Sequence, residues 1–516
     1  MKVSFVTNRV ASKDAVGNNH IYRAAYLLRQ GHEVCIYCND YADIPPGFEN
    51  RIRRVTLADL SGARQSLSSA SHLALAHFTS SDLFIYDYAL YYDLVDSIAW
   101  PKDGVTLFDY HGVTPPELWG TEQGVEPLRR GVEATALVHY ADYAIVHSDY
   151  AKEELVSRTG FDPDRIFRLG YPIHLGRFYP APKDEELARF WGLEDGPVLL
   201  FVGRMAGNKR LEVLVEALKI VNKTIPNAKL LLVGENKAPP YDLFSRRVQL
   251  LAKEYGLEQS VIFTGKVPDD LLPRYYNLAD VYVTSSLHEC FCVPIVEAMA
   301  CGKPVVGADT TAIPFTLGDA GLTFPPEDAE ELADKVVQVL TSEELYARLV
   351  AKGLERAQMF SLERYEQQLD CVLQQVSRGS SRGDDTPEAR LRLASSKSFQ
   401  HELQLLAERA PLSIPYRVRS DKPLIGPLVV WVRNMLTVHL KVFYIDRIVE
   451  RQGLFNSLLV NVLRALVQHL DRLTSRLERA AAAMERQEQV ERALAQVEEE
   501  LSALRREVAE LKGKGR

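Results

Sequence analysis

The chain has 516 residues, which predicts more than one hydrophobic core, since a domain takes roughly 150 residues. Hydrophobic residues make up 46% of the chain and charged residues 25%, an ordinary globular composition that excludes wholesale disorder and fibrous classes. With 61 basic and 69 acidic residues the formal net charge is -8, so the whole chain lacks the basic field that nucleic-acid binding requires.

The N-terminus and the cysteines bear on the cellular compartment. The apolar run in MKVSFVTNRVASK is too short for a secretion signal, so we expect a cytoplasmic protein. Six cysteines in so long a chain are not a disulfide framework. Cys35 and Cys38 lie in one predicted strand that points them to opposite faces, which argues against a redox pair.

The first part of the chain alternates short apolar strands with helical stretches. Residues 2–8 predict a buried strand, Gly17, Asn18 and Asn19 predict a turn before a helix, and Gly31 predicts the end of that helix. Further β-rich runs follow, DLFIYDY, VTLFDY and ADYAIVHS. This βα alternation predicts a parallel, doubly wound sheet.

The alternation stops in a stretch rich in proline and charge, residues 172–197, and then restarts with GPVLLFVGR. We therefore place a domain boundary near residue 185. The fold class predicted is α/β, with two tandem Rossmann-like domains over residues 1–184 and 185–376, followed by an α-helical and coiled-coil tail.

The tail has three predicted parts. Residues 377–423 are polar and predict a linker. Residues 424–462 begin with a very apolar stretch that Arg433 and other charges interrupt, which predicts an amphipathic segment rather than a membrane span. Residues 463–512 repeat apolar positions at steps of three and four and predict a coiled coil, with a single amphipathic helix as the alternative.

The sequence HECFCVPIVEAMACGKPVVG, residues 288–307, is the most specific motif. Pro294 suits the first turn of a helix and Gly302 its end. The start of such a helix exposes backbone N–H groups and a positive dipole end, which favours a phosphate. Glu289 precedes this helix and Glu297 lies within it, so two acceptors for hydroxyl groups can face one cleft.

This motif resembles the signature of the family 4 retaining glycosyltransferases, which have the GT-B fold. The match comprises Glu289, Phe291, Cys292, Pro294, Glu297, Ala298, Met299, Ala300, Gly302, Pro304 and Val305. The resemblance covers roughly residues 1–375. One departure is Cys290, which stands where the family usually has glycine and adds a Cβ beside the expected donor sugar.

The resemblance implies roles for particular residues. Glu297 would bind the ribose hydroxyls of a nucleotide, and Glu289 would face the donor sugar. Arg204 and Lys209, which follow a strand ending at Gly203, would neutralise the leaving diphosphate.

The same resemblance implies further donor contacts. Val267 follows another strand, where the family lines the nucleobase pocket. Phe291 and Pro294 belong to the donor-binding motif, and His111 would touch the donor sugar near the reaction centre, unless it is a histidine satisfied within the core. The segment around Gly17 would help to frame the acceptor side.

The reaction implied is the transfer of a hexosyl unit from a nucleoside diphosphate sugar to a hydroxyl group of a glycan or lipid-linked glycan, with anomeric configuration retained. Such tailed transferases commonly serve cell-surface polysaccharide assembly. We expect no cofactor and no metal ion, since the D-x-D string at Asp162 and Asp164 falls in a predicted turn. A non-catalytic GT-B scaffold, or a GT-B epimerase or phosphorylase, remains the alternative.

We expect the tail to determine where and how the chain assembles. The coiled coil predicts a homo-oligomer. The apolar strip of residues 424–449 beside basic residues predicts a peripheral contact with the inner face of an anionic membrane or with a partner, and docking on the second domain is the alternative.

Overall fold

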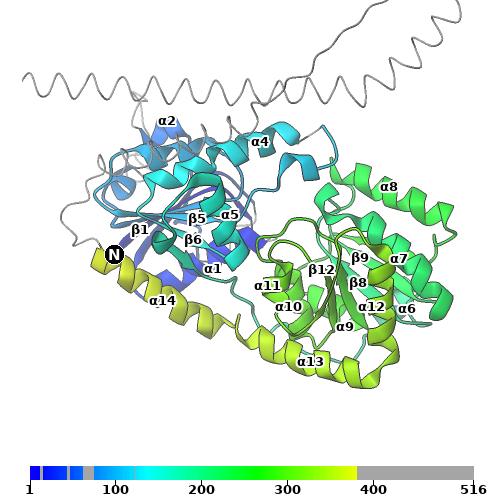
Figure 1. The fold of residues 1–516 in the computed structure, drawn as a ribbon. Coiled ribbons are helices and arrows are strands. Elements are labelled where there is room, and N and C mark those ends of the chain that lie inside the picture. Colours follow the sequence, from blue (N-terminus) through cyan, green and yellow to red (C-terminus); the bar gives the residue numbers. More distant parts are fainter. Residues whose placement is uncertain (12–14, 43–46, 62–74, 123, 380–516) are drawn as a thin grey trace, which may run out of the picture. The chain divides into compact units, whose positions relative to one another are not determined.

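A computed structural model describes residues 1–11, 15–42, 47–61, 75–122 and 124–379 (Figure 1). Both sheets of this part belong to one compact unit of the chain. The predicted linker beyond residue 379, the amphipathic segment and the coiled coil lie outside the described residues. Within the described ranges no helix has both the length and the apolar character needed to cross a membrane.

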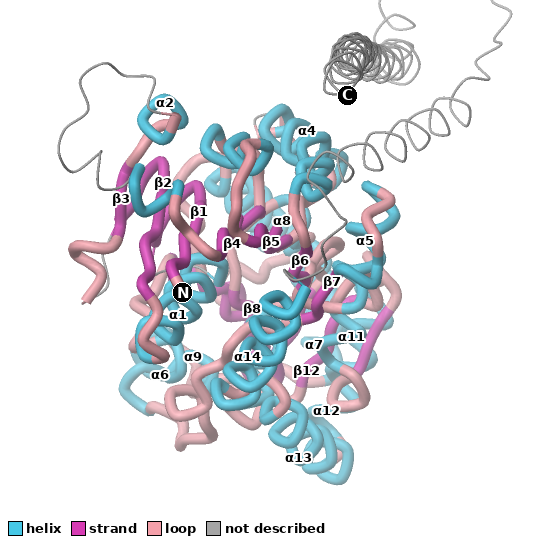
Figure 2. Tube along the Cα trace, turned by 90° about the vertical axis from the view of Figure 1, so that its left-hand side faces the viewer, coloured by secondary structure: helices cyan, strands magenta, loops and turns pink. Residues whose placement is uncertain are grey.

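The first domain contains a seven-stranded parallel sheet with the strand order β3-β2-β1-β4-β5-β6-β7 (Figure 2). Its strands are β1 (Lys2–Ala11), β2 (Glu33–Ala42), β3 (Ile52–Arg54), β4 (Leu83–Tyr88), β5 (Val105–Tyr110), β6 (Tyr143–Val146) and β7 (Ile166–Arg168). Its α-helices include α1 (Ala15–Arg29), α2 (Leu57–Leu60), α4 (Val125–Glu133) and α5 (Asp149–Thr159), and its 3-10 helices are η1 (Asp93–Ala99), η2 (Pro116–Leu118), η3 (Ala134–Tyr140) and η4 (Pro163–Arg165).

The second domain contains a six-stranded parallel sheet with the order β10-β9-β8-β11-β12-β13. Its strands are β8 (Val198–Val202), β9 (Lys229–Val233), β10 (Val261–Gly265), β11 (Val281–Thr284), β12 (Val305–Ala308) and β13 (Leu322–Phe324). Its helices are α6 (Glu185–Trp191), η5 (Gly207–Lys209), α7 (Leu211–Thr224), α8 (Tyr241–Glu254), α9 (Leu272–Leu278), α10 (Val293–Ala300), α11 (Ile313–Leu317), α12 (Ala329–Thr341) and α13 (Glu343–Gln358).

Both sheets are parallel and carry continuous apolar strands, as expected where helices cover both faces. Every residue of β4 is buried, and so is every residue of β11. The strand order reverses next to β1 and β4 in the first sheet and next to β8 and β11 in the second. The two sheets confirm the predicted Rossmann-like architecture. In such folds ligands bind outside the carboxyl ends of the strands at this reversal, which is therefore the candidate location of a site.

The last described helix, α14 (Leu362–Gly379), packs on the first domain, although the sequence places residues up to 376 with the second (Figure 1). Tyr365 and Leu369 are buried in one hydrophobic cluster with residues of α1 and the first sheet. The hydroxyl of Tyr26 also donates to Asp370 at 2.8 Å. The chain therefore crosses to the second domain and returns.

Two local expectations about the N-terminal strand and turn are wrong. The first strand continues to Ala11, and Gly17, Asn18 and Asn19 lie inside α1 rather than in a turn before it. Tertiary contacts outweigh the poor helix propensity of these residues, since the buried Asn19 accepts a hydrogen bond from Tyr365 at 3.0 Å. The opposite facing of Cys35 and Cys38 is confirmed, because each belongs to a different core cluster.

Candidate functional site

Helix α10 begins as the motif predicts. Cys292 precedes it with a φ of 69°, Pro294 lies in its first turn, and Gly302 follows its end with a φ of 67°. The N–H of Gly302 donates to the carbonyl of Met299 at 2.9 Å, which satisfies one of the last carbonyls of the helix. The first turn of α10 thus follows directly on the loop that carries Glu289.

Lys209 and Glu289 form an ion pair at the carboxyl end of the second sheet. Lys209 ends η5, just after β8, and Glu289 follows β11, so adjacent parallel strands bring them together. Their side chains are only 15% and 17% exposed. The backbone N–H of Glu289 donates to Thr311 Oγ1 at 3.0 Å, which attaches the loop to the segment before α11.

Arg204 follows β8, in the same segment between β8 and α7 that contains Lys209, and is exposed. Its guanidinium donates to the hydroxyl of Tyr241 at 3.3 Å. The N–H of Gly203 donates to the carbonyl of Val233 at 2.9 Å, and a Cβ on Gly234 would lie 1.8 Å from the Gly203 carbonyl oxygen. The backbone of these two strand ends can approach closely only because Gly234 has no side chain.

Glu297 accepts a hydrogen bond from the hydroxyl of Tyr276 at 2.6 Å. Burial raises the pKa of Glu297 from 4.5 to about 7, while Tyr276 and the charge of Arg177 oppose the rise. Burial also raises the pKa of Cys292, with smaller contributions from both Glu289 and Glu297. The charges of both motif carboxylates therefore act on the thiol at the start of α10.

The remaining predicted donor contacts are mostly packing residues in this structure. Phe291 is buried, with its ring centroid 5.3 Å from that of Tyr171 and 5.1 Å from that of Phe360. Val267 is partly buried and packs against the core of the second domain. Pro294 is partly buried in the first turn of α10.

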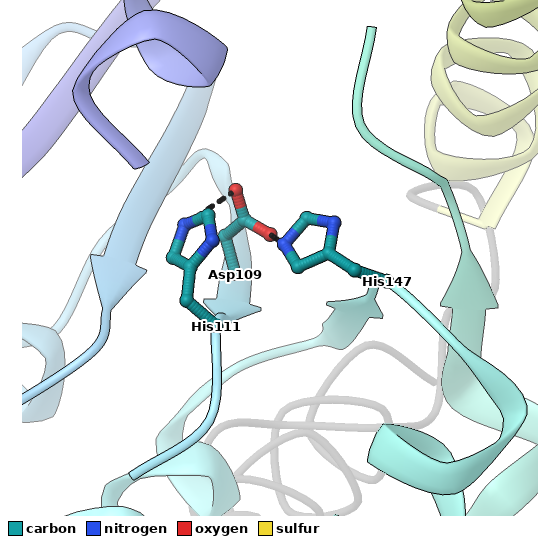
Figure 3. A group of neighbouring side chains, drawn as sticks. All are labelled: Asp109, His111 and His147. Carbon is teal, nitrogen blue, oxygen red and sulfur yellow. Dashed lines mark ion pairs between the residues drawn. The ribbon is translucent and has the colours of Figure 1, made fainter. Parts of the chain in front are cut away.

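His111 lies at the end of β5 in a buried network that Figure 3 shows in part. Its Nδ1 is 2.6 Å from the hydroxyl of Tyr171, and its Nε2 is 3.4 Å from a carboxylate oxygen of Asp87 and of Asp109. The other carboxylate oxygen of Asp109 lies 3.1 Å from Nε2 of His147. Burial lowers the pKa of His111, but the charge of Asp109 and hydrogen bonds to both aspartates raise it to about 9.

Sequence reasoning did not find the cation that completes this network. Arg23, on α1, is fully buried and donates to Asp109 at 2.6 Å and to the hydroxyl of Tyr365 at 2.9 Å. Burial alone would raise the pKa of Asp109, but Arg23 and the two histidines hold it well below its ordinary value. No local signal marks Arg23, because its partners come from β5 and α14.

A second buried network was also missed, and it joins the two domains. Glu154, on α5, lies 2.9 Å from Nε2 of His288 and 3.7 Å from Sγ of Cys290. Arg158 and the hydroxyl of Tyr110 each donate to the same carboxylate at 2.8 Å. A pair such as Glu154 and Arg158, four residues apart on a helix, resembles an ordinary surface pair in the sequence.

Each network places three potential metal ligands within 4.8 Å of one another, namely Asp109, His111 and His147, and Glu154, His288 and Cys290. In both cases an arginine already pairs with the carboxylate, Arg23 in one and Arg158 in the other. A divalent cation would therefore meet a neighbouring positive charge. Ion pairing accounts for both clusters. The D-x-D aspartates lie in the turn at η4, as predicted.

Comparisons with known proteins find glycosyltransferases similar to both domains. Residues 18–176 match the family model described as Glycosyltransferase Family 4, and residues 183–356 match the model described as Glycosyl transferases group 1. The serotype-specific mannosyltransferase WbdA of Escherichia coli is 25% identical over 373 residues, 70% of this chain and 44% of WbdA. The D-inositol 3-phosphate glycosyltransferase of Mycobacteroides abscessus is 32% identical over 217 residues, 42% of this chain and 48% of that relative.

Solved structures show the same fold. Anabaena HepE in complex with UDP has a TM-score of 0.59 and 18% identity, covering 73% of this chain and 100% of that one. Sucrose-phosphate synthase from Thermosynechococcus elongatus has a TM-score of 0.57 and 21% identity, with the same coverage. The two domains thus define a GT-B fold. Residues 18–176 and 183–356 are similar to glycosyltransferases, and the chain spans less than half the length of the two curated relatives named above.

Proposed function

We propose that the chain is a retaining glycosyltransferase that moves a hexosyl unit from a nucleoside diphosphate sugar to a hydroxyl group of a glycan or lipid-linked glycan, in cell-surface polysaccharide assembly. The observation that carries the proposal is the paired Lys209 and Glu289 beside the start of α10, inside a motif typical of the family. The mannosyltransferase relative supports a hexosyl donor.

In the proposed reaction the bond between the anomeric carbon and the diphosphate breaks, and a bond to the acceptor oxygen forms on the same face. The acceptor proton passes to an oxygen of the departing diphosphate. Lys209, Arg204 and the N–H groups at the start of α10 stabilise the negative charge that develops there. Glu297 accepts hydrogen bonds from the ribose, and Glu289 and His111 face the sugar.

The proposal is tested with a panel of UDP- and GDP-hexoses and a set of glycan acceptors. We expect one donor to release its nucleoside diphosphate only when an acceptor is present, and nuclear magnetic resonance of the product to show the donor's anomeric configuration. Release of an epimerised sugar without acceptor would instead favour an epimerase. Failure to bind any nucleotide sugar would favour a non-catalytic scaffold.

We also propose that the reaction needs no metal ion, because protein cations and a helix terminus supply the positive charge. Activity should then survive EDTA, and a strict requirement for Mg²⁺ or Mn²⁺ would contradict this part of the proposal. A homo-oligomer formed by residues 463–512 and a peripheral membrane contact by residues 424–449 remain proposals about the tail. Light scattering and flotation with anionic liposomes test them.

A further inference from the structure

Glu154 is a buried glutamate of the first domain, and it lies outside the motif of residues 288–307. Its side chain is 6% exposed, although it lies on α5, whose neighbouring Glu153 is exposed. Burial alone would raise the pKa of Glu154, but His288, Arg158 and Tyr110 together hold it below its ordinary value. The carboxylate is therefore ionised and fully engaged at neutral pH.

Two of the groups around Glu154 come from the second domain. Nε2 of His288 lies 2.9 Å from Oε1, and Sγ of Cys290 lies 3.7 Å from Oε2. These two residues stand immediately before and after Glu289. One carboxylate of the first domain thus contacts both chain neighbours of the carboxylate that is proposed to face the donor sugar.

The same loop is also attached to the second domain. The side-chain amide of Asn208 donates to the carbonyl of His288 at 3.2 Å, and the N–H of Ala312 donates to the carbonyl of Glu289 at 3.2 Å. These bonds hold the backbone of the loop from its own domain. The contacts with Glu154 hold its side chains from the other domain, so the loop is fixed between the two.

Gly112 shows how closely the loop meets the first domain. A Cβ on Gly112 would lie 1.8 Å from Sγ of Cys290, so the cysteine occupies the space that a side chain there would need. Cys290 is 7% exposed and belongs to the core cluster of the first domain, although it is part of the second domain's loop. The cysteine that departs from the family pattern is therefore a contact between the domains.

We propose that Glu154 is a positioning residue for Glu289. Through His288 and Cys290 it attaches the donor-facing loop to the first domain, so that closure of the two domains and correct placement of Glu289 occur together. We name Glu154, His288 and Cys290 the interdomain clamp. The catalytic part of this inference rests on the proposed function, whereas the clamp itself can be tested without any reaction.

The first experiment compares Glu154→Gln with the matched control Glu153→Gln, an exposed neighbour on the same helix. Glutamine keeps the shape of the side chain but replaces one acceptor oxygen by a donor amide. We expect kcat to fall by about tenfold or more while the donor KM changes by less than about threefold, because a small displacement of a positioned group slows chemistry more than binding. A rise in the donor KM as large as the fall in kcat, or an unchanged kcat, would overturn the proposed positioning role.

A double variant separates positioning from general damage to the structure. His288→Leu removes one of the two contacts from the second domain and leaves those of Cys290, Arg158 and Tyr110 with Glu154 intact. If both variants act through one contact, Glu154→Gln combined with His288→Leu should be no slower than the slower single variant, within about twofold. If the fold losses in kcat of the two single variants multiply in the double variant, the two side chains act independently, which would refute the clamp. His288→Leu alone also serves if Glu154→Gln does not fold.

The second experiment needs no activity. Modification of each cysteine by iodoacetamide is followed by peptide mass spectrometry in the wild-type protein and both glutamine variants. We expect Cys290 to react about tenfold faster or more in Glu154→Gln, because the loop leaves the first domain more often, while the exposed Cys371 reacts equally in all three. An unchanged rate at Cys290 would refute the clamp. A wild-type protein without transferase activity would refute the proposed function, and the cysteine rates would still test the clamp.

Discussion

Lys209 and Arg210 are adjacent cations in different surroundings. Lys209 is largely buried against Glu289, whereas Arg210 pairs with Glu327 and is 39% exposed. We expect Lys209→Ala to lower kcat by about 10²–10³, the usual loss when one electrostatic stabiliser of a transition state is removed. Arg210→Gln is the matched control and should stay within about twofold of wild type in the same assay. Full activity of Lys209→Ala would disprove its proposed role at the diphosphate.

Glu297 should make the stability of the protein depend on pH. Its pKa is about 7 in the folded protein and about 4.5 when exposed, so the folded state binds the proton more tightly. This contribution to stability is complete below pH 4.5 and is lost as the pH rises through 7. Melting temperatures between pH 4.5 and 8 should therefore fall less steeply in Glu297→Gln than in wild type. Parallel curves for the two proteins would contradict the raised pKa.

The sequence could indicate the residues of the motif but not their buried partners. Lys209 and Glu289 follow neighbouring strands of a predicted parallel sheet, and strand order alone brings them together. Arg23 and Glu154 gain their roles from contacts more than 80 positions away in the chain. Such contacts depend on tertiary packing, which leaves no local pattern.

The loop that carries Glu289 packs closely against the segment after β5. Gly112 in that segment leaves the space that Cys290 of the loop fills. Gly112→Ala would force its Cβ against Cys290 and would also strain a backbone with a φ of 83°. We expect a loss of roughly 1–3 kcal/mol from overpacking and about 1–2 kcal/mol from the backbone. In a Cys290→Gly background the clashing side chain is absent, so the overpacking part of this loss should disappear, as measured by denaturant unfolding.

Gly160 provides the control for that experiment. Its φ is 66°, and a Cβ there would have no atom within 4 Å, so Gly160→Ala measures the backbone strain alone. If Gly112→Ala is no more destabilising than Gly160→Ala, the loop does not lie against Gly112 as described.

Element boundaries were predictable where the stop and start signals were strong. Pro294 and Gly302 mark the two ends of α10, and the structure confirms both. Gly17, Asn18 and Asn19 carry weak helix propensity and were predicted as a turn, but buried contacts of Asn19 keep them helical. Burial therefore decides the structure where local preference is weak.

At the scale of the whole molecule, α14 completes the first domain although it follows the second domain in the sequence. A chain ending at residue 361 should be several kcal/mol less stable than a chain ending at residue 379. Tyr365, Leu369 and Val372 leave the core in the shorter chain, and each buried side chain of this size contributes about 1.5–3 kcal/mol. Scanning calorimetry of both chains tests this, and equal melting temperatures would contradict the packing of α14.

The two sheets were predictable because βα alternation appears twice in the sequence with a break between, but the return of α14 was not. An amphipathic helix at the end of a domain shows which of its faces is apolar and not which domain that face will cover. The contacts of Tyr365 with Arg23 and Asn19 fix α14 on the first domain, and no sequence pattern marks any of the three residues.

The position of α14 also has a consequence for synthesis. A ribosome makes the first sheet early, yet the helix that covers part of its core is translated only after the whole second domain. During that interval the apolar surfaces of α1 and its neighbours have no cover, and exposed apolar surface in an unfinished domain favours aggregation. Release of the nascent chain from chaperones should therefore follow the emergence of residues 362–379 rather than the completion of either sheet.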